Sequence, residues 1–152
     1  MGQISLAVRD KVVAFDSAPL IYYLEDHPKF SNLAHEVFDS IHQGHTIGIT
    51  SIVSLMEVLV LPLRRGHAEL ADQYRRLLLH TRAVTIAPVD LPVCEWAARL
   101  RAKHAWLRSP DALQFATAIT NKADLVVTND ERWKRLMEIP VIVLSDFAET
   151  EP

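Results

Sequence analysis

The sequence predicts an α/β fold built on a parallel β-sheet with helices on both faces. Short runs of β-branched residues alternate with longer stretches of helical periodicity, the order found when helices connect parallel strands. The strand runs are apolar throughout, as expected of strands covered on both sides. The 152 residues fit a single domain, assigned to residues 1–152. A domain of this size buries enough surface to fold without a disulfide or a structural zinc ion.

Five strands are expected, because five short apolar runs end at polar or turn-forming residues. These runs cover residues 12–15, 46–50, 84–87, 125–128 and 141–144. Open α/β sheets bind their ligands beyond the carboxyl ends of the strands. The residues that follow each strand are therefore the first place to look for a functional site.

Seven helices are expected between these strands. Ser31 and Gly44 suit the start and the end of one helix, and Ser109 with Pro110 suits the start of another. The apolar helix that starts at residue 51 is expected to end near Pro62 and Gly66. The expected helices cover residues 19–25, 31–43, 51–63, 68–80, 91–104, 109–121 and 131–137.

The composition excludes several classes of protein. The chain has 16 Lys and Arg against 19 Asp and Glu, a net charge of −3, so it is not a generally basic nucleic-acid binder. Metal cations can still reverse the local charge at a cluster of carboxylates. The single cysteine, Cys94, excludes an internal disulfide and fits a cytoplasmic location. No apolar run is long enough to span a membrane, and there is no glycine-rich phosphate loop.

Four acidic residues stand at positions that favour a common site. Asp16 and Asp130 follow the first and fourth expected strands, and Asp111 lies in the first turn of an expected helix. Each of these three also suits an ordinary helix cap or helix dipole. Glu57 is the only charged residue between positions 51 and 63, and burying it is costly unless it is paired or metal-bound. The alternative for Glu57 is a capping box with Ser54.

If the first and fourth strands are neighbours, these four carboxylates meet in one crevice. Such a cluster cannot stay fully ionised without cations. Oxygen ligands without His or Cys favour Mg²⁺ or Mn²⁺. The chemistry that suits such a site is hydrolysis of a phosphodiester bond, because one metal ion activates water and another stabilises the leaving oxygen.

The chain resembles a PIN-domain ribonuclease of the VapC toxin type. The resemblance rests on four segments in family order, VAFDSAPLIYYLE (13–25), SIVSLMEVL (51–59), SPDALQFATA (109–118) and LVVTND (125–130). It implies a PIN-like three-layer fold whose five-stranded parallel sheet has the order 3-2-1-4-5. It also implies an endoribonuclease that depends on Mg²⁺ or Mn²⁺ and acts on RNA. A toxin of this kind has an antitoxin as its partner and forms a homodimer.

The resemblance also assigns roles to individual residues. Three residues resemble direct metal ligands, and a fourth acid resembles a ligand that binds directly or through water: Asp16, Asp111, Asp130 and, as the fourth, Glu57. Ser17 and Asn129 resemble hydrogen-bonding supports. Ala18 departs from the pattern, because many relatives have Asn there, and this affects the expected hydrogen bonds around the acids. Arg108, just before the Asp111 helix, is a candidate contact for a substrate phosphate.

Three further questions stay open at this level. The chain could be a non-catalytic PIN-fold module that binds protein or RNA without turnover. It could also be a phosphoacceptor domain, although such domains resemble this one poorly, because they pair two acids after the first strand and place a Lys after the fifth. Here the fifth strand is followed by Ser145, Asp146 and Phe147. The apolar residues 22–24 and 55–63 serve either the core or a groove for the antitoxin.

Overall fold

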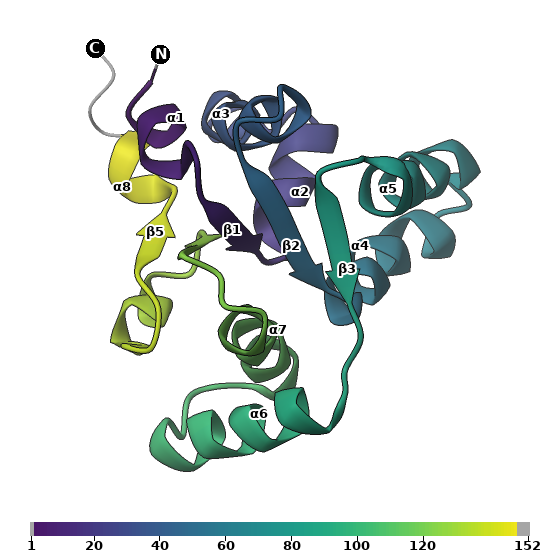
Figure 1. Cartoon of the computed structure of the whole chain (residues 1–152). Coiled ribbons are helices and arrows are strands. Elements are labelled where there is room, and N and C mark those ends of the chain that lie inside the picture. The colour runs from purple at the N-terminus through teal and green to yellow at the C-terminus, as the bar shows by residue number, and fades with distance from the viewer. Residues whose placement is uncertain (1, 149–152) are drawn as a thin grey trace.

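The computed structural model describes residues 2–148 and contains one five-stranded parallel sheet (Figure 1). The strand order is β3-β2-β1-β4-β5, which confirms the predicted fold class and order. All four neighbouring pairs are parallel. The strands are β1 (Val12–Phe15), β2 (Ile47–Ser51), β3 (Val84–Ala87), β4 (Leu125–Thr128) and β5 (Val141–Val143).

The helices cover both faces of this sheet (Figure 1). Helices α1 to α5 and α8 pack on one face, and α6, α7 and the 3₁₀-helix η1 pack on the other. Their bounds are α1 (Gln3–Val8), α2 (Ser17–Leu24), α3 (Ser31–His42), α4 (Ile52–Arg64), α5 (Ala68–His80), α6 (Leu91–Lys103), α7 (Ser109–Thr120), η1 (Glu131–Arg135) and α8 (Ser145–Ala148). None of the helices within residues 2–148 is both long and apolar enough to cross a membrane.

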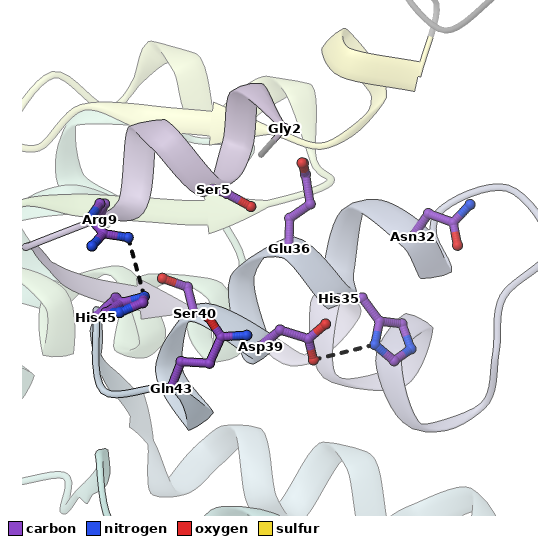
Figure 2. A pocket seen from close by; sticks show the side chains of 10 residues that line it. All are labelled: Gly2, Ser5, Arg9, Asn32, His35, Glu36, Asp39, Ser40, Gln43 and His45. Carbon is purple, nitrogen blue, oxygen red and sulfur yellow. Dashed lines mark hydrogen bonds and ion pairs between the residues drawn. The ribbon is translucent and has the colours of Figure 1, made fainter.

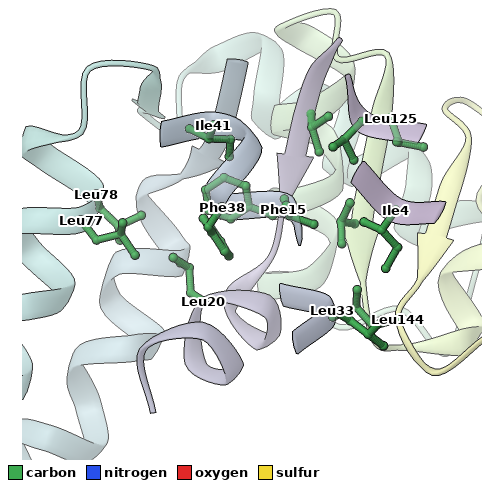
Figure 3. Packing of buried hydrophobic residues seen from close by; sticks show 14 of the residues in the cluster. Ile4, Phe15, Leu20, Leu33, Phe38, Ile41, Leu77, Leu78, Leu125 and Leu144 are labelled. Atoms are coloured by element: carbon green, nitrogen blue, oxygen red, sulfur yellow. The ribbon is translucent and has the colours of Figure 1, made fainter. Parts of the chain in front are cut away.

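Alternation along the central strand explains the two layers of helices. Val13 and Phe15 point into the core on the α1–α5 side, whereas Ala14 points into the core beneath α6 and α7. On the first side, the Phe15 ring meets the Phe38 ring of α3 edge to face, with the ring centres 5.1 Å apart (Figure 3). The two cores hold β1 rigidly, and they thereby fix the position of Asp16 at its carboxyl end.

The structure differs from the sequence prediction mainly at short elements. The helices α1 and α8 were not predicted, because six and four residues are too few to show a helical period. Helix α2 begins at Ser17, two residues earlier than expected, so that Pro19 takes its third position. The expected helix 131–137 is a 3₁₀-helix that ends at Arg135.

Candidate metal centre

Four acidic side chains from four different elements meet at the carboxyl edge of the sheet. Asp16 directly follows β1, and Asp130 follows the neighbouring strand β4. Asp111 lies in the first turn of α7, and Glu57 lies in the second turn of α4. The charges of Asp111 and Glu57 act on Asp16, and those of Glu57 and Asp130 act on Asp111. These charge effects link Asp16, Glu57 and Asp111 to one another and link Asp130 to them through Asp111, and we call the four acids the acidic cluster.

Asp16 is the most buried member of this cluster, with 8% of its surface exposed. Its Oδ2 accepts a hydrogen bond of 2.7 Å from the Thr128 hydroxyl, whereas its Oδ1 is buried without a hydrogen-bond partner among the described residues. Burial, helped by the nearby charges of Asp111 and Glu57 and opposed by the Thr128 hydrogen bond, raises the pKa of Asp16 to about 7. Asp16 does not cap α2 with its side chain. A buried, unpartnered carboxylate oxygen of this kind suits a bound cation.

Glu57 is held by two polar side chains from different helices. Its Oε1 accepts hydrogen bonds from the Ser17 hydroxyl of α2, at 3.2 Å, and from the Gln114 side-chain amide of α7. The capping box with Ser54 does not form, because α4 begins at Ile52 and Ser51 is its cap. The acid is therefore oriented toward its neighbours in the cluster by α2 and α7 rather than used to start its own helix.

Asp130 differs from the other acids because it already has a cationic partner. Its two carboxylate oxygens accept hydrogen bonds from the Arg132 guanidinium, from Nε at 3.0 Å and from Nη2 at 2.7 Å. The Arg132 hydrogen bond lowers the pKa of Asp130. The Asp130 side chain also caps η1 through the backbone N–H of Arg132. The capping interpretation from the sequence is thus correct for Asp130, in addition to its place in the cluster.

Asp111 is half-buried and sits between opposing charges. Burial raises its pKa, and the charges of Glu57 and Asp130 raise it further. The charges of Arg108 and Arg132 lower it. Arg108 is exposed and occupies the position before the first residue of α7. Its charge therefore acts on the cluster from the solvent side.

The two predicted supports have different roles in the structure. Ser17 contacts an acid, namely Glu57. Asn129 contacts none of the four acids through a hydrogen bond that the structure shows; it donates to the Tyr22 hydroxyl at 3.1 Å and accepts from the Ser145 backbone N–H at 2.9 Å. Asn129 thus ties the loop after β4 to α2 and α8, which fixes the backbone that carries Asp130.

Two functional contacts were not anticipated from the sequence. The Thr128 hydroxyl binds Asp16, and the Gln114 amide binds Glu57. Gln114 is buried and follows Asp111 by one helical turn on a helix otherwise rich in small residues. The sequence signal for this contact is a long polar side chain one turn after Asp111 on an apolar helix. Thr128 could have been found as the residue that lies beside Asp16, because Phe15 pairs with Val127 across the sheet.

The chemistry of this cluster fits a divalent cation. Carboxylate oxygens are the ligands that Mg²⁺ and Mn²⁺ prefer, and Asp16 offers a buried oxygen with no partner. Within residues 2–148, however, no three acidic, His or Cys side chains form a ready-made ligand set. The contact between Asp130 and Arg132 is one reason, because it directs one acid toward a protein cation. The donor types fit a divalent cation, although the four acids are not gathered into a ligand set within residues 2–148.

In the absence of metal ions, Asp16 is expected to make the protein less stable as the pH rises. The carboxyl keeps its proton up to about pH 7 in the fold, against 3.8 in an unfolded chain, so the folded state binds more protons in this window. The free energy of unfolding should fall by roughly 3 kcal/mol between about pH 5 and pH 8, and then level off. Urea unfolding in EDTA measures this change. Asp16→Asn should remove most of it, and an equal fall in both proteins would contradict the assignment.

A second polar hollow lies at the opposite edge of the sheet, between α1 and α3 (Figure 2). It has a volume of about 410 Å³ and contains none of the four acids. Charged and titratable groups there pair with one another. Arg9 Nη1 lies 3.2 Å from His45 Nδ1, and His35 Nδ1 lies 3.6 Å from Asp39 Oδ1. These groups satisfy each other, and the carboxyl edge remains the candidate site.

Comparison with known families identifies the class of protein. Residues 13–139 match the PIN domain family, and this span includes all four acids. The chain therefore belongs to the PIN-domain family, and the resemblance read from the sequence is confirmed. No curated protein sequence gives a significant match to this chain.

Solved structures with the same fold share little sequence with this chain. The sarcin–ricin-loop-cleaving toxin VapC20 from Mycobacterium tuberculosis matches with a TM-score of 0.68 at 17% identity, covering 84% of this chain and 98% of that one. A toxin–antitoxin complex from Klebsiella pneumoniae matches at 0.64 and 20% identity, covering 87% and 97%. VapBC2 from Rickettsia felis, bound to a promoter DNA fragment, matches at 0.63 and 16% identity, covering 87% and 98%. At these identities the matches establish the fold.

Proposed function

We propose that this protein is an endoribonuclease that depends on Mg²⁺ or Mn²⁺, and that it acts as a VapC-like toxin. The observation that carries the proposal is the meeting of four carboxylates at the carboxyl edge of the sheet, one of them with a buried and unpartnered oxygen. Membership of the PIN-domain family supports it, as does the similarity in fold to a toxin described as cleaving the sarcin–ricin loop.

The four acids share the task of holding the cation under this proposal. Asp16, Asp111 and Asp130 would hold the cation, and Glu57 would hold it directly or through water. The bound cation would activate water and stabilise the leaving oxygen of the RNA phosphodiester. Thr128 orients Asp16 through its hydrogen bond.

The remaining residues position the acids and the substrate. Ser17 and Gln114 hold Glu57 from α2 and α7, so the acid keeps its orientation when the substrate arrives. Asn129 holds the backbone before Asp130. Arg108, exposed at the start of α7, would contact a phosphate of the RNA.

The decisive experiment is cleavage of a structured RNA pool by the purified protein. We expect cleavage with Mg²⁺ or Mn²⁺, no cleavage in EDTA, and recovery when the metal is restored. Cleavage that is unaffected by EDTA would refute the metal-dependent mechanism.

A second candidate is a PIN-fold module that binds a partner without turnover. The observation that favours it is the bidentate contact of Arg132 with Asp130, which neutralises one of the acids within the protein itself. It predicts RNA or protein binding with no cleavage in saturating Mn²⁺. The other three acids form no such salt bridge within residues 2–148, and burial raises the pKa of two of them, Asp16 and Asp111; both facts favour the nuclease.

An antitoxin protein is the proposed partner, with the toxin a cytoplasmic homodimer. Helix α4 offers a surface for it, because its outer face exposes an apolar stripe spaced at helical intervals, Ile52, Met56, Val60 and Leu63. Tyr22, Tyr23 and Leu24 instead pack against the core, so the core interpretation holds for those residues. Because α4 also carries Glu57, a segment seated on the stripe lies next to the acids. The similar structure from Klebsiella pneumoniae, described as a toxin–antitoxin complex, supports this partner.

Charged substitutions on this stripe are expected to separate the toxin from its antitoxin. Met56→Asp combined with Val60→Asp should leave RNA cleavage unchanged, because both side chains are exposed and face away from the core. Inhibition by the co-expressed antitoxin should weaken at least about a hundredfold. The matched control is Leu91→Asp, an equally apolar exposed residue on α6. Full inhibition of the double variant would show that the antitoxin binds elsewhere. Light scattering measures the molar mass in solution and so tests the homodimer separately.

A further inference from the structure

Two arginines of η1 lie over the ring of a tryptophan from the loop between α6 and α7. The guanidinium carbons of Arg132 and Arg135 are 5.3 Å and 5.9 Å from the centre of the Trp106 ring. Trp106 lies in the loop between α6 and α7, half-buried against the core beneath those helices. We call these three residues the arginine–tryptophan surface. Cation–π contacts of this kind hold a guanidinium in a preferred orientation without neutralising its charge.

The arginine–tryptophan surface borders the acidic cluster directly. The Arg132 guanidinium lies over the indole and also hydrogen-bonds both carboxylate oxygens of Asp130. Its charge acts on Asp111 as well. The other cation of η1, Lys134, is directed away, toward Asp146 of α8 at 2.6 Å. Arg132 is thus the cation of η1 that borders the acids, and Arg135 shares the Trp106 ring with it.

The contact between Arg132 and Asp130 can be exchanged for a phosphate. The Arg132 side chain is 49% exposed, and an exposed ion pair of this kind contributes little to stability. A phosphate group accepts the same two parallel hydrogen bonds from a guanidinium that a carboxylate does. Asp130 is also an acid that the proposed cation would need. An arriving phosphate therefore gives Arg132 a new partner and releases Asp130 for the cluster.

We propose that the arginine–tryptophan surface seats the RNA strand beside the carboxylates, with Arg132 exchanging Asp130 for a backbone phosphate. Arg135 binds an adjacent phosphate, and Trp106 is a positioning residue that keeps both guanidinium groups turned toward the strand. The inference rests on the proposed ribonuclease function for the identity of the anion. A polyanionic strand fits the surface better than a single acidic side chain, because two exposed guanidinium groups contact one ring.

The test measures binding without cleavage. A fluorescein-labelled single-stranded RNA of about 12 nucleotides is titrated with protein in EDTA, and its anisotropy is followed at several salt concentrations. Arg132→Ala and Arg135→Ala are each expected to weaken binding by about tenfold and to reduce the salt slope by about one. Arg132→Lys should keep the salt slope and recover part of the affinity, because it restores the charge but not the paired hydrogen bonds. Trp106→Leu should weaken binding and leave the slope unchanged.

The matched control is Arg99→Ala. Arg99 lies over Trp96 at 5.2 Å, so it has the same chemistry on the surface of α6, and it should bind RNA as the unmodified protein does. Equal binding and salt slopes for Arg132→Ala, Arg135→Ala and the unmodified protein would overturn the proposal, as would no RNA binding at all. If the variants still bind RNA but no longer bind the antitoxin, the surface binds an acidic protein segment. That result also overturns the proposal.

This experiment separates the inference from the proposed function. Loss of binding in the arginine variants of a protein that never cleaves RNA would support the surface and refute the nuclease. If the protein cleaves RNA but neither arginine variant changes its RNA affinity, the result would support the nuclease and refute the role of the surface. Thermal melting of each variant identifies any that fails to fold, and Arg132→Lys then decides the result for Arg132.

Discussion

Replacing Asp16 with Asn is expected to reduce RNA cleavage by about a hundredfold to a thousandfold while leaving the fold intact. The amide has the shape of the carboxylate, and its oxygen still accepts the hydrogen bond from Thr128. It lacks the negative charge that a divalent cation needs. Asp111→Asn should have an effect of similar size, because Asp111 is half-buried and the charges of both Glu57 and Asp130 act on it.

The control for these variants is Glu131→Gln. Glu131 follows Asp130 in the chain and is exposed, so neutralising it changes the local charge without entering the cluster. Cleavage is measured on the RNA pool in Mn²⁺, with circular dichroism as the check on folding. The double variant of Asp16 and Asp111 should be little worse than either single variant, because the acids act as one unit. Retained activity in both single variants would sink the four-acid mechanism.

The second large effect concerns the stability conferred by the metal ion. Burial and neighbouring charges disfavour the ionised form of Asp16 in the metal-free protein, and a bound cation removes this penalty. Mn²⁺ at about a hundred times its dissociation constant contributes roughly 3 kcal/mol of stability. For a domain of this size, the melting temperature should rise by about 5 to 10 °C.

Asp16→Asn should abolish most of this rise, and excess EDTA should reverse it in the unmodified protein. Differential scanning calorimetry measures both effects on the same samples. Glu131→Gln again serves as the control and should keep the full rise. A rise of equal size in Asp16→Asn would mean that the stabilising ion binds away from the cluster.

Much of the architecture was predictable because periodicity and burial agree along the chain. The five apolar runs became the five strands, and Asp16 and Asp130 follow two of them. The strand order came from the family resemblance rather than from the runs themselves, since short apolar strands carry no information about their neighbours. Once β1 and β4 are adjacent, parallel pairing alone brings the strand ends that precede Asp16 and Asp130 to the same edge of the sheet.

The contacts that orient the acids could not be predicted in the same way. Gln114 of α7 hydrogen-bonds Glu57 of α4, and Arg132 of η1 hydrogen-bonds Asp130, the residue just before η1. Both depend on how helices pack and on local 3₁₀ geometry, which sequence spacing does not fix. Asn129 was expected to support the site and instead anchors its loop through Tyr22 and Ser145. The residue types were informative, but their partners were set by the tertiary structure.

The most direct test of the central claim is to locate Mn²⁺ in crystals of the protein by its anomalous scattering. We expect a peak in contact with the carboxylates of Asp16 and Asp111, with Glu57 and Asp130 beside it. Asp16→Asn crystals treated in the same way should lack that peak. A peak confined to other acids, or no peak in crystals of a protein that still cleaves RNA in the same Mn²⁺ solution, would contradict the claim that these four acids form the metal-binding site of a ribonuclease.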